Sequence, residues 1–230
     1  MNTTTLRIKH YWLLPVIILM QNYTSSGDAL SAKESQVHQT GSVVVADFRQ
    51  VDLLELMKQD SSDLLSTEVV DLVLGSGASA SFRLSDSVSG AFTKRGAEQT
   101  LYILVKKEFV STASQVTSPV VAIFENARPV TRFVLSDGSY TKAQAVVDVD
   151  EDGFDEVLLA APVIHMGREL IAADLYGFNN PQEIKHQEIG LVFESTCAKD
   201  ALSNGEVTAA LISKTTSQKL QVQQIMESCL

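Results

Sequence analysis

The chain has 230 residues, of which 45% are hydrophobic and 20% are charged, a mixture that is ordinary for a globular protein. This composition excludes a wholly disordered chain, a collagen and a membrane protein with many spans. The formal net charge is −10, which argues against non-specific binding to DNA or RNA, because neutralising phosphates needs clustered lysine and arginine.

The N-terminus has the layout of a secretory signal peptide. Basic residues open the chain, Tyr11 to Met20 is an uncharged apolar run, and small and polar residues follow up to Ala29. The apolar run is well short of the roughly 20 residues that a helix needs to cross a bilayer. We therefore expect residues 1–29 to be a cleaved signal peptide and the protein to be secreted or periplasmic. The alternative is a short N-terminal anchor that is never cut.

Two cysteines, Cys197 and Cys229, remain after that cleavage. An even number of cysteines in an exported chain predicts one disulfide bond. The bond would close a loop of about 32 residues and stabilise the fold by roughly 3–4 kcal/mol. The alternative is two free thiols. Neither cysteine lies in a C-x-x-C pattern, so redox catalysis and a zinc site have no support.

The beginning of the body combines one strand with a helical region. Residues 30–42 are polar and predict a flexible leader, and Val43 to Phe48 predict a first strand. Leucines recur at helical spacing within residues 51–74, with an interruption at residues 60–62. A glycine-rich stretch follows, and it ends the helical pattern.

Beyond residue 80, short apolar runs alternate with turn residues, which is typical of antiparallel sheets. The hairpin signal is clearest where Val120–Phe124 and Val130–Leu135 flank a short polar turn. The other expected strands are Leu101–Val105, Gln144–Val147, Glu156–Ala161, Leu170–Leu175, Ile189–Phe193, Val207–Ile212 and Leu220–Ile225. The fold class predicted is mainly β with a short helical segment near the N-terminus, or α+β. Residues 43–230 would form one β-rich domain, in which residues 43–100 could pack as a subdomain.

One segment, residues 148–156, has the composition of a cation-binding loop. It reads Asp-Val-Asp-Glu-Asp-Gly-Phe-Asp-Glu, with acidic residues at loop positions one, three, five and nine and glycine at position six. Ca²⁺ takes six to eight oxygen ligands, which a tight loop of alternating aspartates can direct at one point. The candidate ligands are the side chains of Asp148, Asp150, Asp152 and Glu156 and the backbone carbonyl of Phe154. The alternative is a solvated acidic turn.

The surroundings of this loop differ from an EF-hand. Position twelve is Leu159 rather than a chelating glutamate, and apolar strand-like runs flank the loop where an EF-hand has helices. The order strand, D-x-D-x-D-G-x-D-E, strand resembles the calcium loops of FG-GAP and VCBS repeats over about residues 130–162. The resemblance implies bound Ca²⁺, the same five ligand residues and a loop that joins two strands of a propeller blade. Glu151 stands where that family commonly has glycine.

A propeller needs about four to eight similar blades, whereas this chain contains one copy of the acidic loop. We therefore expect antiparallel sheets that include a single propeller-blade-like unit.

Three functions remain open at this stage, of which the third is a subunit of a cell-surface assembly that completes its sheets with the strands of a partner. The preferred one is an exported calcium-binding β-protein in which the ion is structural, without catalysis, with a protein partner at the cell surface or in the periplasm. The alternative is an exported hydrolase whose active site is braced by Ca²⁺ and draws on polar residues elsewhere: Asp47, Ser79, Glu98 and His165.

Overall fold

The computed structural model describes residues 42–51, 63–107, 118–136, 139–165, 168–180, 182–197 and 205–228. All of them belong to one compact unit, Gln39–Leu230. Four predicted features lie outside the described residues: the signal peptide, the leader up to residue 41, residues 52–62 of the helical region, and Cys229. The structure does not test these predictions.

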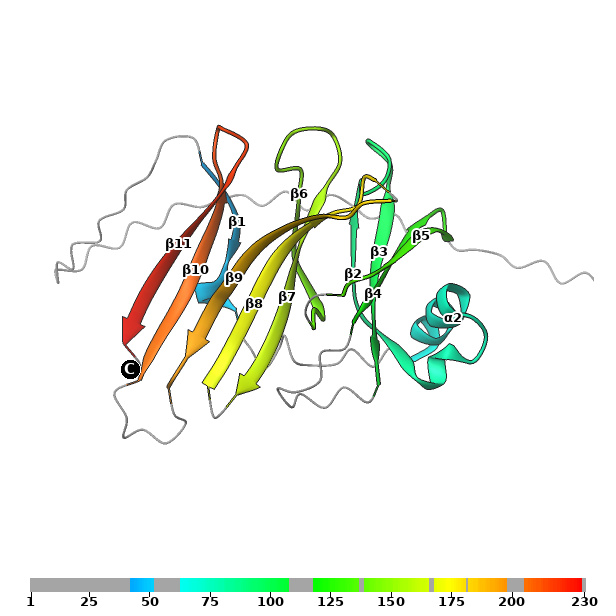
Figure 1. The fold of residues 1–230 in the computed structure, drawn as a ribbon, viewed down its shortest axis with the longest axis horizontal. Coiled ribbons are helices and arrows are strands. Elements are labelled where there is room, and N and C mark those ends of the chain that lie inside the picture. Colours follow the sequence, from blue (N-terminus) through cyan, green and yellow to red (C-terminus); the bar gives the residue numbers. More distant parts are fainter. Residues whose placement is uncertain are drawn as a thin grey trace, which may run out of the picture. The chain divides into compact units, whose positions relative to one another are not determined.

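The described chain is mainly β and forms two antiparallel sheets (Figure 1). The larger sheet follows the order β1-β10-β9-β8-β7-β6, which is barrel-like and nearly closed, and β11 adds to the other edge of β10. Its strands are β1 (Val43–Asp47), β6 (Lys142–Val147), β7 (Glu156–His165), β8 (Arg168–Gly177), β9 (Lys185–Ser195), β10 (Glu206–Lys214) and β11 (Leu220–Ser228).

The smaller sheet is a meander whose strands pair in chain order, and one helix packs on it. The strands are β2 (Phe82–Gly90), β3 (Gln99–Lys106), β4 (Val120–Glu125) and β5 (Arg128–Val134). The helix is α2 (Asp63–Leu74), and short 3₁₀ turns η1 (Phe48–Gln50) and η2 (Ala78–Ala80) follow β1 and α2. The Ser66 hydroxyl accepts a hydrogen bond from Leu84 N at 3.1 Å, which fixes α2 against β2.

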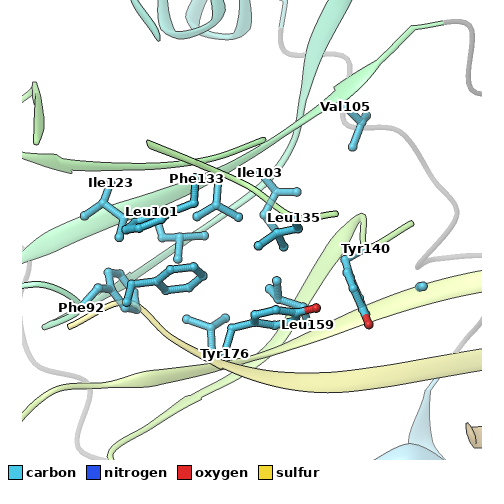
Figure 2. Packing of buried hydrophobic residues seen from close by; sticks show 14 residues of the cluster. Phe92, Leu101, Ile103, Val105, Ile123, Phe133, Leu135, Tyr140, Leu159 and Tyr176 are labelled. Carbon is cyan, nitrogen blue, oxygen red and sulfur yellow. The ribbon is translucent and has the colours of Figure 1, made fainter. Parts of the chain in front are cut away.

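The inner strand β3 of the smaller sheet is covered on both faces, and its side chains alternate between two different clusters. On β3, Leu101 and Ile103 point toward the larger sheet, whereas Tyr102 and Leu104 contact the layer that includes α2. Figure 2 shows the first group: rings and aliphatic side chains from the smaller sheet face Leu159 and Tyr176 of the larger one. This shared core holds the two sheets together.

The larger sheet has a second core on its other face. On β7, Val157 and Leu159 join the core between the sheets, whereas Leu158 and Ala160 join this second cluster. Phe48 of η1 belongs to the same cluster and is fully buried. Strand β7 is therefore apolar on both faces, as is typical of a central strand. The acidic loop ends at Glu156, the first residue of β7, so this buried strand fixes the end of the loop.

The prediction of antiparallel sheets is confirmed, and so is the hairpin of β4 and β5. Its turn is tighter than expected. Asn126 and Ala127 alone connect the strands, both with positive φ, and Pro129 lies within β5. The second part of the predicted helical region is helix α2.

Two expectations differ from the structure. Strand β2 was not predicted, because Asp86 and three serines interrupt its apolar alternation. A bulge between Leu84 and Asp86 also changes which face its side chains meet, so Leu84 packs toward α2 and Val88 toward the larger sheet. In addition, the acidic loop lies in a seven-stranded sheet rather than in a four-stranded blade.

Residues 43–100 contribute to both sheets. Strand β1 pairs with β10 of the larger sheet, whereas β2 pairs with β3 of the smaller one.

Candidate metal centre

The acidic loop connects β6 to β7 at one end of the larger sheet. Val147 and Glu156 face each other as the last pair of this hairpin, so the loop is closed at its base by the sheet itself. The expected strands on both sides of the loop are confirmed.

Backbone N–H groups of the loop fold back onto its own carboxylates. The carboxylate oxygens of Asp148 accept hydrogen bonds from Asp152 N at 3.1 Å and from Gly153 N at 3.0 Å. Asp150 also accepts from Asp152 N, at 3.2 Å. Two residues have left-handed backbone, Gly153 with φ +86° and Glu151 with φ +58°. Glycine adopts this conformation freely, whereas glutamate adopts it at a cost.

Three carboxylates of the loop meet at one point and can hold a metal ion. One oxygen from each of Asp148, Asp150 and Glu156 lies within 4.8 Å of the others. Glu156 is only 5% exposed, and Val149 N donates a hydrogen bond of 2.9 Å to its Oε2. Burial raises the pKa of Glu156 to about 7, and the negative charges of Asp150 and Asp152 act in the same direction.

The other two predicted ligands belong to the same loop but not to this group. The carboxylate of Asp152 accepts hydrogen bonds from Phe154 N at 2.9 Å and from the Asn179 side chain at 3.2 Å. The ring of Phe154 lies under the guanidinium of Arg95, 5.1 Å from the ring centroid. The participation of Asp152 and of the Phe154 carbonyl in ion binding remains a prediction.

Two lysines from distant strands reach the loop. Lys185 of β9 pairs with Asp150 at 3.2 Å and with Asp152 at 3.4 Å. Lys214 of β10 pairs with Glu151 at 2.9 Å and donates to the backbone carbonyl of Asp148 at 2.8 Å. With the Arg95 guanidinium, three positive groups lie against five carboxylates, those of residues 148, 150, 151, 152 and 156. Negative charge therefore remains in excess at the loop.

Asp155 connects the loop to the smaller sheet. Its carboxylate accepts a hydrogen bond of 2.6 Å from Ala91 N, and its own N–H donates to Ala91 O at 3.1 Å. Gly90, which precedes Ala91 in the chain, has no room for a side chain, since an added Cβ would lie 2.9 Å from the Asp155 carboxylate. The loop is thus attached to both sheets.

A second buried carboxylate, Asp174 on β8, was not singled out by the sequence. One of its oxygens accepts hydrogen bonds from the Tyr140 hydroxyl and from His186 Nε2, the latter at 2.9 Å. The other oxygen accepts from Ile189 N at 3.0 Å and Gly190 N at 3.4 Å, where the pairing of β8 and β9 is irregular. The Tyr176 ring stacks on His186 with centroids 4.7 Å apart.

Burial alone would raise the pKa of Asp174, but the hydrogen bonds from Tyr140, His186 and the two backbone N–H groups outweigh it and lower this pKa. The same burial and the same partner raise the pKa of the Tyr140 hydroxyl far above its usual value. Asp174 is therefore held as a carboxylate with its acceptors satisfied. In the sequence, the only indication of this buried carboxylate is a single acidic residue, Asp174, within the apolar run Leu170–Leu175.

The polar residues considered for a hydrolase have local contacts in different elements. Asp47 caps η1 and pairs with Arg49 at 2.7 Å. Ser79 N donates to Asp71 at 2.7 Å in the turn after α2, and Glu98 is exposed before β3. His165 ends β7, and its side chain lies outside the described part of the structure.

The predicted disulfide joins the ends of two strands that flank β10. Ser195 of β9 and Glu227 of β11 both pair with Val207, on its two sides. The two strands therefore end at the same edge, about 10 Å apart. Cys197 is not a free thiol. Cys229 lies outside the described residues, so the pairing of Cys197 with Cys229 remains a prediction.

Comparisons with protein-family models, with curated proteins and with solved structures found no match for this chain. Within the described ranges, no helix has the length and apolar character required for a membrane span.

Proposed function

We propose that this protein is an exported calcium-binding β-protein in which the ion has a structural rather than a catalytic role. The observation that carries the proposal is the convergence of Asp148, Asp150 and Glu156, three carboxylates whose ligand oxygens lie within 4.8 Å of one another.

The chemistry of the group favours a hard divalent cation. All three side chains offer oxygen, and neither imidazole nor thiolate belongs to the group. Three carboxylates at this distance repel one another, and one of them is buried, so a cation between them removes an unfavourable interaction as well as adding a favourable one.

Calcium suits the loop better than magnesium. Mg²⁺ demands nearly ideal octahedral geometry, whereas Ca²⁺ accepts six to eight oxygens in irregular arrangements. The carboxylate of Asp152 and the carbonyl of Phe154 stand at the loop positions that the resemblance to FG-GAP and VCBS repeats assigns to further ligands. Water would supply the remaining oxygens through the small cavity of about 190 Å³ that Asp150 and Glu156 line.

A structural role follows from where the loop is attached. Its base is the β6–β7 hairpin, Lys185 and Lys214 connect it to β9 and β10, and Asp155 connects it to the smaller sheet. An ion that fixes the loop would stabilise its attachment to the hairpin and, through Asp155, to the smaller sheet, whereas at Asp150 it would take the place of Lys185 as the positive partner. Because the unfolded chain does not gather the carboxylates, ion binding raises the stability of the fold by mass action.

The export signal agrees with this role. Extracellular calcium modules commonly bind with dissociation constants of about 10⁻⁴–10⁻³ M, and the layout of residues 1–29 is that of a signal peptide. A loop of this affinity would be occupied outside a cell.

The test is thermal unfolding of the purified protein in Ca²⁺ and in chelator. At a free Ca²⁺ concentration about ten times the dissociation constant, the free energy of unfolding of the wild type rises by about 1.4 kcal/mol. The Asp150→Asn variant loses most of this response. Glu188→Gln, which alters an exposed carboxylate on β9, is the matched control and keeps it. An equal response in wild type and Asp150→Asn contradicts the proposal.

A further inference from the structure

Strand β11 is an edge strand without a partner on its outer side among the described residues. Its nine residues pair with β10 in continuous register, and most of them are exposed. Figure 1 shows β11 at the end of the larger sheet, beyond β10. A row of unpaired backbone N–H and C=O groups along such an edge is a template for another strand.

The other sheet edges carry features that prevent strand pairing, and β11 does not. Strand β5 contains Pro129 and two arginines, β2 has a bulge beside Asp86, and β1 is five residues long with a bulge after Val44. Strand β6, the last edge in the described part of the chain, begins with Lys142 and has a bulge after Ala143, whose N–H donates to Asp86 of the other sheet. In contrast, β11 reads Leu-Gln-Val-Gln-Gln-Ile-Met-Glu-Ser, with no proline, lysine or arginine and no shift in register. It is the edge of this fold best suited to pair.

The sequence of β11 is complementary to itself in antiparallel orientation. With a two-fold axis at Gln224, Val222 of one copy faces Met226 of the other, and Gln221 faces Glu227. Val222 is 39% and Met226 is 71% exposed in the single chain, so this register covers two apolar side chains in each copy. It also uses the full length of the strand, and it places the carboxylate of Glu227 opposite an amide rather than opposite another carboxylate.

Charge also favours this edge as the place where two copies meet. The chain has a net charge of −10, which opposes self-association in general, so a contact between copies is favoured where few charged side chains stand. Glu227 is the only charged residue in β11, so repulsion between copies is weak along this strand.

We propose that a second copy of this chain docks on β11, strand to strand and antiparallel, and that the two larger sheets become one continuous sheet in a two-fold dimer. The contact is isologous, so it closes at two copies. This inference does not depend on ion binding at residues 148–156.

The test is sedimentation velocity of the purified protein over a range of concentrations, in Ca²⁺ and in chelator. The wild type is expected to show a reversible equilibrium between monomer and dimer in both buffers. Met226→Lys places a charge at the edge and weakens the dimer. Val134→Lys, at a position that is 61% exposed on the edge strand β5, is the matched control and leaves the equilibrium unchanged.

The register has its own test at position 221. Gln221→Lys places an ammonium opposite Glu227 of the second copy and strengthens the dimer, whereas Gln221→Glu opposes like charges and weakens it. Each substitution acts twice in a two-fold dimer, so the dissociation constant changes by about twofold to thirtyfold in opposite directions. Circular dichroism checks that each variant is folded.

Three results would overturn the proposal. One is a wild type that stays monomeric up to about 1 mM. Another is a dimer that Met226→Lys leaves intact, which would place the contact on a different surface. The third is a dimer on which Gln221→Lys and Gln221→Glu have the same effect.

Discussion

Two buried carboxylates on neighbouring strands of the larger sheet have opposite electrostatic environments. Glu156 at the start of β7 is 5% exposed and Asp174 on β8 is 7% exposed. The pKa of Glu156 is raised to about 7, whereas the pKa of Asp174 is lowered. Burial acts against the charge of both, so the difference comes from their neighbours.

The neighbours differ in number and sign. Asp174 accepts hydrogen bonds from Tyr140, His186 and two backbone N–H groups. Glu156 accepts one, from Val149 N, and stands beside two further carboxylates. A buried carboxylate with four donors is satisfied within the protein. Glu156 has one donor and like-charged neighbours, and the Lys185 ammonium that pairs with Asp150 offsets only part of the effect, so the pKa of Glu156 stays raised. This contrast is the physical basis for placing a cation at Glu156 and none at Asp174.

The largest expected effect is that of removing Asp174. The Asp174→Ala variant leaves the Tyr140 hydroxyl and two backbone N–H groups without their acceptor in a buried region. We expect the free energy of unfolding in urea to fall by about 3 kcal/mol. Glu188→Gln, on the exposed surface of β9, should change it by less than about 0.5 kcal/mol. A variant as stable as the wild type would show that these donors have other acceptors.

The stabilisation from Asp174 depends on pH in a direction fixed by its lowered pKa. Below the ordinary pKa of 3.8, Asp174 becomes protonated in the unfolded chain while it stays ionised in the folded chain, so the free energy of unfolding falls as the pH falls. The difference in unfolding free energy between wild type and Asp174→Ala is therefore full above pH 3.8 and shrinks as the pH drops through the folded value. Urea titrations of both proteins across this range measure it, and a difference that stays constant would contradict the assignment.

Glu156→Gln is expected to change the free energy of unfolding in the opposite direction from Asp174→Ala when no Ca²⁺ is present. In chelator at about pH 8, the neutral amide removes a buried charge next to Asp148 and Asp150, and we expect the variant to match the wild type or exceed its stability by about 1 kcal/mol. In Ca²⁺ the order reverses, because the variant has lost a ligand. Melting curves in the two buffers test both statements. A Glu156→Gln variant that is destabilised equally in both would assign Glu156 the same role as Asp174.

The two carboxylates also differ in how far the sequence could predict them. Asp148, Asp150 and Glu156 lie within nine consecutive residues. The alternation of aspartates and the position of one glycine were therefore enough to predict that these residues share a site. The loop is local, and the apolar runs on its two sides predicted its flanking strands. Asp152 shows the limit of this reasoning, because its side chain bonds to Asn179, which is distant in sequence.

Asp174 could not be predicted in this way. Its partners Tyr140, His186 and Ile189 come from other segments, and only the pairing of β8 with β9 brings them together. Strand β2 was missed for a related reason. Asp86 reads as a strand breaker, yet its carboxylate accepts a hydrogen bond of 2.9 Å from Ala143 N in the other sheet. Polar residues that serve tertiary contacts carry no local signal.

The smallest expected effect concerns Glu151, where glycine would suit the backbone. Its φ of +58° costs a residue with a Cβ about 1 kcal/mol. Glu151→Gly removes that cost but also removes the ion pair with Lys214 and the hydrogen bond from Gln218, so the net change should be below about 1 kcal/mol.

Glu151→Ala is the matched variant, because it loses the same contacts and keeps the unfavourable φ. We expect the glycine variant to be more stable than the alanine variant by about 1 kcal/mol in chelator. Both should keep the response to Ca²⁺, since Glu151 is not part of the carboxylate group. If the alanine variant equals the glycine variant, the loop relaxes around position 151. In that case the ion itself, and not the fold of the empty loop, would bring the carboxylates of Asp148, Asp150 and Glu156 together.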